Sequence, residues 1–101
     1  MAAPRAKYYG DKPQPITVLK GTATLDFPSI AAATSAELTI TVTGAAVGNA
    51  VALAPPATLT AGLVAFGRVT ATNTVTVRLA NVTASAIDPA SATWGASVIQ
   101  T

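Results

Sequence analysis

The side chains that could carry out chemistry are few and scattered in this chain of 101 residues. It contains four acidic residues, no His and no Cys. Without His or Cys, the chain cannot form a Ser–His or Cys–His nucleophile pair, and zinc lacks its usual nitrogen and sulfur ligands. We therefore predict that the protein is not an enzyme and has no catalytic residue, no bound metal and no cofactor.

The acidic residues are Asp11, Asp26, Glu37 and Asp88. Among them, Asp26 and Glu37 are the pair that could supply the acid and the base for glycoside hydrolysis. Both occupy outward positions of predicted strands, where carboxylates are ordinarily solvated. A surface role is therefore favoured, and a small enzyme completed by a metal or by a partner's residues is the weakest alternative.

Two short motifs have simple structural interpretations. Residues 44–48 contain two glycines, but neither a Lys-Ser/Thr pair nor a predicted helix follows, so we predict a turn and not a phosphate-binding loop. Asn81, Val82 and Thr83 match the glycosylation sequon. The charged N-terminal residues are not followed by the apolar segment of a secretion signal, so we interpret the sequon as a chance match.

Composition and charge restrict the possible partners. Half of the residues are hydrophobic and only 10% are charged, against roughly 25% in an ordinary soluble domain. A membrane helix needs about 20 apolar residues in a row, and no such run occurs. The hydrophobic residues are mostly Ala and Val, which build a thin core in so short a chain and favour association with other subunits.

The positive charge is concentrated at the N-terminus. Residues 1–20 carry four positive charges against Asp11, a net charge of +3, whereas the rest of the chain has a net charge of −1. A nucleic-acid-binding domain clusters Lys and Arg on a folded face. We therefore predict no nucleic acid, no membrane and no small-molecule substrate among the partners.

Alternation of apolar and polar residues predicts short strands along most of the chain. Residues 36–53 are predicted to form a hairpin, with two strands joined by a tight turn at the glycines. Residues 63–82 are predicted to form a second hairpin with a turn at residues 71–73. Further strands are predicted at residues 16–27 and 93–99, separated from the hairpins by Pro-containing connectors into which Ile30 and Ile87 are tucked. The predicted fold is all-β: a single antiparallel β-sandwich, jelly-roll-like, over residues 16–101.

Two aromatic residues are candidate core or interface anchors. Trp94 shares one strand face with Ala96 and Val98, and a packing role is favoured over a sugar-stacking platform. Phe66 lies in a strand whose two faces both look partly buried, as between two layers or at a subunit contact. Gly67 beside it is compatible with either a bulge or a close backbone approach.

Arg68 and Arg78 fall on neighbouring strands of the second predicted hairpin. Their partner is open at this point: Asp26, Glu37 or a neighbouring subunit could receive them, and a plain surface charge is the default interpretation.

Residues 1–15 are predicted to form an extended N-terminal arm, because they contain three prolines and no periodic pattern. The arm is either a disordered tail or a docking arm. In the second case Tyr8 and Tyr9 supply contact area, and Arg5, Lys7 and Lys12 supply attraction to an acidic surface.

Several segments resemble a family of small bacteriophage structural domains. They are GTATLDFPSIAA (21–32), AELTITVTGAAVGNAVALAPPA (36–57), AGLV (61–64), TNTVTVRLANVTASAIDPASATW (72–94) and SVI (97–99). Domains of this family occur in tail-fibre-like proteins and in short stand-alone virion proteins. The resemblance implies a jelly-roll-like sandwich that assembles as a trimer on the outside of a virion, and it does not extend to the arm.

A short basic arm followed by one sandwich resembles a capsid decoration (cement) protein. The expected protein is made in the host cytoplasm, forms a homotrimer and binds the major capsid protein at the surface of the head, which it stabilises. Three arms on one trimer would gain avidity. The alternative is a tail-fibre or head-fibre receptor-binding domain that recognises a host surface glycan, for which a groove with clustered aromatic residues is expected.

Overall fold

The computed structural model describes residues 8–9, 12–13 and 16–100, the first four of these by their backbone. The described residues form eight strands and no helix, in agreement with the predicted all-β class. The strands are β1 (Tyr8–Tyr9), β2 (Lys12–Pro13), β3 (Thr17–Leu25), β4 (Ser35–Thr41), β5 (Ala50–Ala54), β6 (Leu63–Ala71), β7 (Thr74–Asn81) and β8 (Ala92–Gln100).

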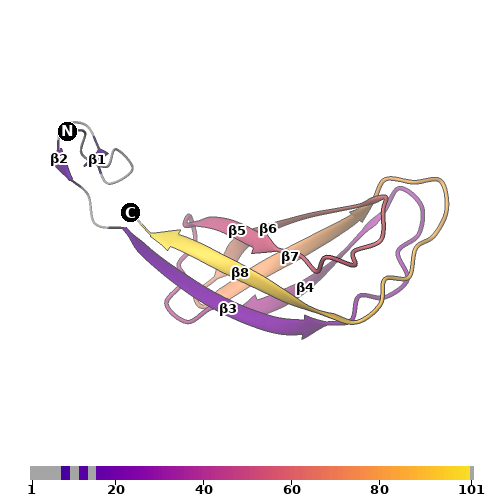
Figure 1. The fold of residues 1–101 in the computed structure, drawn as a ribbon, viewed down its shortest axis with the longest axis horizontal. Coiled ribbons are helices and arrows are strands. Elements are labelled where there is room, and N and C mark those ends of the chain that lie inside the picture. Colours follow the sequence, from indigo (N-terminus) through magenta and orange to yellow (C-terminus); the bar gives the residue numbers. More distant parts are fainter. Residues whose placement is uncertain (1–7, 10–11, 14–15, 101) are drawn as a thin grey trace.

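Two antiparallel three-stranded sheets make up the body of the protein. Their strand orders are β3-β8-β5 and β4-β7-β6. Figure 1 shows the sheets one behind the other, with β3 and β8 nearest to the viewer. A sandwich-like arrangement of this kind buries the inner face of each sheet against the other.

The core lies between the sheets and consists mostly of aliphatic side chains from alternate strand positions. At one end Phe27 and Trp94 pack edge to face, with ring centroids 5.6 Å apart and an interplanar angle of 62°, an arrangement that the quadrupoles of the rings favour. Ile30 is buried as predicted, and its backbone pairs with that of Ile87. The buried core residues are Leu25, Phe27, Ile30, Ile40, Val42, Ala45, Leu63, Val69, Val75, Val77, Leu79, Trp94, Ala96 and Val98.

The prediction of a hairpin over residues 36–53 is wrong. β4 pairs with β7 and β5 pairs with β8, so the two strands belong to different sheets. The connection between them folds inward, with Val42 and Ala45 buried. Its backbone is hydrogen-bonded to that of Asn73, in the turn between β6 and β7. Alternation identified both strands, but it carries no information about which strand pairs with which.

The second predicted hairpin is confirmed. β6 and β7 pair antiparallel around a turn at Thr72 and Asn73. A bulge between Val69 and Ala71 brings Val69 opposite Val75, so that these two valines share the inner face. Without the extra residue, the register would be shifted by one position and one strand would turn its apolar side chains outward.

The predicted N-terminal arm, residues 1–15, lies largely outside the described residues. The four that are described pair with one another, Tyr8 opposite Pro13 and Tyr9 opposite Lys12. They belong to neither of the two main sheets. The sequence did not predict this short pairing.

Two glycines allow the sheets to approach each other at their edges. A Cβ atom on Gly21 of β3 would overlap the carbonyl oxygen of Thr41 at the end of β4. A Cβ atom on Gly67 of β6 would lie 3.0 Å from a methyl carbon of Leu53 in β5. The sequence allowed either a bulge or a close backbone approach at Gly67, and the structure has the close approach. The bulge of β6 lies further along the strand, between Val69 and Ala71.

The approach at Gly21 leads to a prediction about stability. We expect Gly21→Ala to lower the free energy of unfolding by about 1–3 kcal/mol, because the added methyl group must push backbone apart. Gly95→Ala is the matched control, since its Cβ would lie 3.4 Å from that of Ala54, an ordinary contact. Urea unfolding of the two variants measures the difference. Equal stability of both would show that the edges of the sheets do not constrain the fold.

Candidate interaction surfaces

The outer face of the sheet β4-β7-β6 carries the protein's ion-pair cluster. We call the outward-facing side chains of these strands the arginine face. Glu37 of β4 lies opposite Arg78 of β7, which lies opposite Phe66 of β6. Arg78 donates from Nε to Oε2 of Glu37 at 2.8 Å, and its Nη2 lies 2.8 Å from the same oxygen as an ion pair. Arg68 donates from Nη1 to this oxygen at 3.3 Å. Of the three partners that the sequence left open for the arginines, Glu37 is therefore the one observed.

The cluster leaves this face with an excess of positive charge. Two guanidinium groups share one carboxylate, so the three residues have a net charge of +1. The hydrogen bond from Arg78, followed by that from Arg68, holds the pKa of Glu37 below its ordinary value of 4.5 despite some desolvation. A carboxylate stabilised in its charged form is poorly suited to general acid or base catalysis near neutral pH. The suggested catalytic pair with Asp26 therefore gains no support from the geometry.

Apolar side chains lie next to this cluster. Phe66 is 49% exposed, and Val64 and Val82 are similarly or more exposed. Phe66 and Val82 border an open hollow of about 440 Å³ at the end of the face where β4 begins and β7 ends, and Val64 lies opposite Ala80 at its rim. The hollow is lined by Ala33, Thr34, Ser35, Phe66, Arg78, Ala80, Asn81 and Val82. Phe66 thus lies at the surface and not in the core, and its role as an interface anchor stays a prediction.

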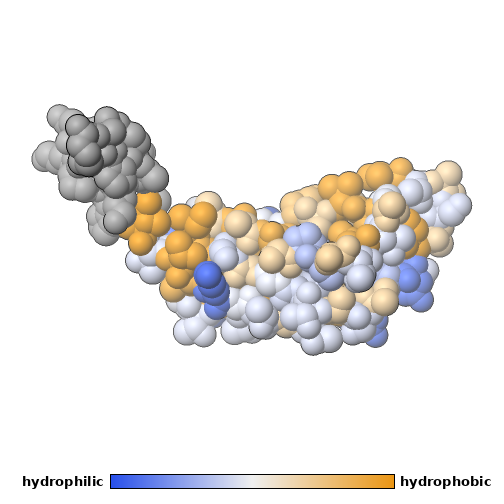
Figure 2. Space-filling view, in the orientation of Figure 1, coloured by the Kyte–Doolittle hydropathy of each residue, from blue (hydrophilic) through white to orange (hydrophobic). Residues whose placement is uncertain are grey.

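The outer face of the other sheet has a different character. We call the outward-facing side chains of β3, β8 and β5 the alanine face. Cross-strand rows on it include Lys20, Ser97 and Ala52, then Thr22, Gly95 and Ala54. Figure 2 shows this side of the molecule, which is mostly pale or orange over β3 and β8. Lys20 is the one charged residue among the outward positions of these three strands.

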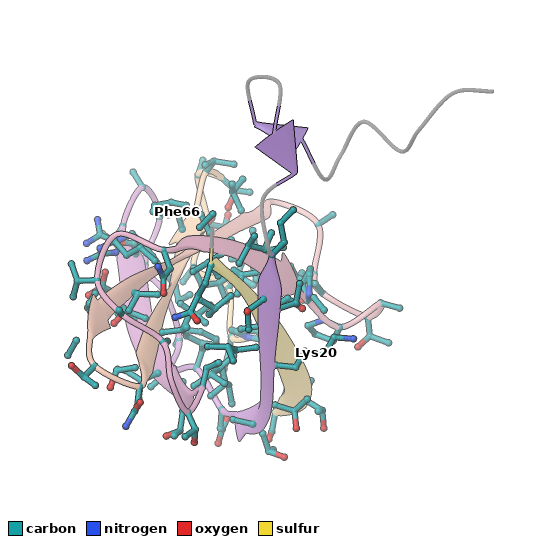
Figure 3. The ribbon with its side chains drawn as sticks, turned by 90° about the vertical axis from the view of Figure 1, so that its left-hand side faces the viewer. Lys20 and Phe66 are labelled. Atoms are coloured by element: carbon teal, nitrogen blue, oxygen red, sulfur yellow. The ribbon has the colours of Figure 1, made fainter. Side chains whose placement is uncertain are left out.

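The alanine face becomes more apolar toward the beginning of β3. Val18, Ile99 and Ala50 form the next row, and the exposed side chain of Ile16 follows. Figure 3 labels Lys20 and Phe66, which belong to different sheets and lie on separate parts of the surface. The protein therefore offers two chemically distinct faces. One carries mainly small side chains and is almost uncharged, and the other is positively charged with exposed aromatic and aliphatic groups.

Trp94 lies in the core, only 2% exposed, with Phe27 against its ring. Because its ring faces are covered by protein, it cannot serve as a platform for a sugar. Its packing role agrees with the favoured interpretation of the sequence.

The predicted docking residues of the arm fall outside what can be described structurally. Arg5 and Lys7 lie outside the described residues, and Tyr8, Tyr9 and Lys12 are described by their backbone alone. Their role in binding a partner stays a prediction.

The sequon at Asn81 is part of a folded turn. Asn81 is 1% exposed, and its Nδ2 donates to the carbonyl oxygens of Ile30 at 2.9 Å and Ser85 at 2.8 Å. Its Oδ1 accepts from the backbone and the hydroxyl of Thr83 at 2.9 and 2.7 Å. The Asn and Thr of the motif are thus explained by local structure, which agrees with the interpretation of the sequon as a chance match.

Among residues 16–100 and the four described arm residues, no group of acidic, His or Cys side chains could hold a metal ion. The same residues contain no helix that is long and apolar enough to cross a bilayer. Comparisons of the chain with models of protein families, with curated proteins and with solved structures gave no match.

The lowered pKa of Glu37 leads to a prediction about pH. A carboxylate with a depressed folded-state pKa stabilises the protein above its unfolded pKa, and this contribution is lost as the pH falls through the folded-state value. Glu37→Gln should therefore be less stable than the unaltered protein at pH 7, and the difference should shrink as the pH falls below 4.5. Urea unfolding across this pH range measures it.

Asp26→Asn is the control for the loss of one carboxylate, because Asp26 takes part in neither of the ion pairs found among residues 16–100. A stability difference for Glu37→Gln that does not change with pH would show that the ion-pair cluster contributes nothing to folding.

Proposed function

We propose that the protein is a bacteriophage capsid decoration (cement) protein, a homotrimer attached to the surface of the head. In this proposal it is made in the host cytoplasm, binds the major capsid protein through residues 1–15 and stabilises the capsid. The observation that carries the proposal is the alanine face. An almost uncharged surface across a whole sheet is suited to contact with other protein, since charged residues are depleted at the centres of interfaces.

The composition of the core supports self-association. Most buried residues are aliphatic and many are valines and alanines, so a single copy buries little apolar area per residue. Identical subunits usually bury such a face in a closed symmetric assembly, which leaves no copy with the face exposed. The trimeric form itself comes from the resemblance to virion proteins.

The jelly-roll-like form of the sandwich is part of the proposal, and the strand order supports it. The first strand of the two sheets, β3, pairs with the last, β8, and the second, β4, pairs with the one before last, β7. The chain changes sheet at every connection except that between β6 and β7. A long hairpin rolled up on itself produces this order, which is the principle of a jelly roll.

The proposed attachment explains how weak contacts could hold a capsid protein firmly. One short arm buries little surface, but three arms on a trimer raise each other's effective concentration at the shell. A protein that contacts several shell subunits at once opposes their separation, because its binding free energy is lost when they move apart.

The alternative, a fibre domain that recognises a host glycan, requires a groove lined by several aromatic rings. Within residues 16–100, Phe27 and Trp94 are buried, and Phe66 is the one exposed aromatic residue. The capsid proposal is therefore favoured for this part of the chain.

The role of the alanine face in assembly is tested by adding a charge to it. Ala52 is exposed in a single copy of the chain, so Ala52→Lys should fold normally but bury an unpaired ammonium group in the trimer. We expect it to sediment as a monomer at concentrations at which the unaltered protein is a trimer. Ala46→Lys, an equally exposed position in the connection between β4 and β5, is the control. A trimeric Ala52→Lys would exclude the alanine face as the interface, and a monomeric unaltered protein would refute the trimer.

The role of the arm is tested by binding to purified heads that lack the protein. Replacing Arg5, Lys7 and Lys12 with Gln should weaken binding strongly and remove most of its salt dependence, because it removes the attraction to an acidic surface. Replacing Tyr8 and Tyr9 with Ser should weaken binding with the salt dependence kept. Occupancy of the heads, measured by quantitative gel analysis, would be unchanged for both variants if the arm plays no part.

A further inference from the structure

The arginine face has no role in the proposed trimer or in the arm contact, yet it combines three features of a binding surface. It has exposed apolar side chains, an open hollow and an excess of positive charge. We propose that this face, centred on Phe66 and Arg78, binds an acidic segment of a different protein. In that segment a carboxylate lies next to a large apolar side chain.

The charge of the face determines the sign of its partner. Glu37 uses one oxygen, Oε2, to accept from both arginines. Each guanidinium has five N–H donors, so most donors of Arg68 and Arg78 remain available, and both side chains are 40% or more exposed. A carboxylate that approaches Arg78 would form charge-assisted hydrogen bonds and would neutralise the excess charge of the cluster.

The apolar part of the face lies beside this charge. Phe66 is directly opposite Arg78 across the β6–β7 pair, and Val64, Ala80 and Val82 continue the apolar surface toward the hollow. A ligand that reaches Arg78 with its carboxylate would therefore place a neighbouring group against Phe66. Aromatic residues and arginine are enriched among the few residues that contribute most of the binding energy at protein interfaces.

The polar groups around the hollow favour a protein over a sugar. Asn81 uses both its amide donors and its carbonyl oxygen within its own turn. The hydroxyl of Thr34 donates to the carbonyl oxygen of Ala31 at 2.8 Å. A saccharide needs many free hydrogen-bonding partners for its hydroxyl groups, whereas an apolar side chain needs none, and the remaining lining is mainly apolar.

Residues 16–100 do not supply the ligand. The arm has an excess of positive charge, like the face, so the two repel each other. Asp26 and Asp88 are exposed, but the residues beside them are turned inward: Phe27 and Pro89 are buried and Ile87 is partly buried. Neither Asp26 nor Asp88 of a second copy therefore offers a carboxylate next to an exposed large apolar side chain, and Glu37 is already bonded to both arginines of its own copy. The proposed partner is accordingly a protein of different sequence.

The test uses the full-length, ¹⁵N-labelled protein and a synthetic peptide, acetyl-Ser-Glu-Leu-Glu-Leu-Ser-amide. Titration should shift the backbone amide signals of the arginine face saturably, around Phe66, Arg78 and Ala80. Two control peptides, with Lys in place of both Glu or Ser in place of both Leu, should bind about tenfold more weakly or not at all, since each lacks one half of the ligand.

Variants locate the contact. Phe66→Ser and Arg78→Gln should each weaken binding of the peptide by about tenfold. Val47→Ser, which removes an exposed aliphatic side chain elsewhere, and Lys20→Gln, which removes a positive charge from the alanine face, should leave it unchanged. If Phe66→Ser does not give the amide spectrum of a folded protein, Arg78→Gln decides the result.

Three outcomes would overturn the proposal: no saturable shift with the acidic peptide, equal binding of the lysine peptide, or shifts centred on another surface. A fourth is that N-acetylneuraminic acid, a carboxylated sugar, shifts the amides of the arginine face while the peptide does not, which would make this a saccharide site. The experiment involves no phage heads, so its failure would leave the proposed arm contact unaffected, and failure of the arm contact would leave this site unaffected.

Discussion

The arrangement of both sheets depends on a small set of hydrogen bonds to Asn73. The backbone of Asn73 accepts from Val42 and donates to the carbonyl oxygen of Ala45, both at 2.9 Å. Its side-chain oxygen accepts from the backbone of Gly44 at 2.8 Å. Asn73 also adopts a positive φ of 64°, a conformation that Asn tolerates better than most residues. These bonds hold the connection after β4 against the β6–β7 turn, where the chain leaves one sheet for the other.

The position of β4 beside β7 follows from this tie, and so does the chemistry of the arginine face. Glu37 meets Arg78 because β4 and β7 are neighbours, and Phe66 meets Arg78 because of the bulged register of the β6–β7 hairpin. Had β4 paired with β5, the carboxylate and the two guanidinium groups would lie on different sheets. The alanine face also depends on the pairing of β4 with β7, because this pairing leaves β5 free to pair with β8.

Much of this could be derived from the sequence, but only where the interacting residues are close along the chain. Period-two alternation identified the six strands of the two sheets and most of their buried residues, since each apolar position on one face must be covered. It also predicted the β6–β7 hairpin. The extra residue that brings Val69 opposite Val75 was not predicted, although a short turn and the need to bury both valines require it. The opposition of Phe66 and Arg78 could have been found by the same argument.

The pairing of β4 with β7 could not have been found in this way. Thr39 and Thr76 lie opposite each other across more than thirty intervening residues, and many other strand pairings bury the same side chains equally well. The two faces were missed for the same reason, because a surface is formed by strands that only the register brings together. Asn73 carried a weak local signal, as a turn residue, but nothing in the sequence indicated that its partners lie at Val42 to Ala45.

The distribution of charge along the molecule has a further consequence for how it meets a surface. β3 begins where the basic arm ends, and Asp26 and Asp88 lie in the connectors at the other end of the sheets, beyond Leu25 and Asn81. Among residues 16–100, Lys20 lies near the beginning of β3 and the two carboxylates lie at the far end of the sheets, so the charges outside the ion-pair cluster are separated along the strands. In the field of an acidic surface such a molecule turns its basic end inward before contact. If the protein binds an acidic capsid surface as proposed, this orientation would be established during the approach, with the acidic connectors facing the solution.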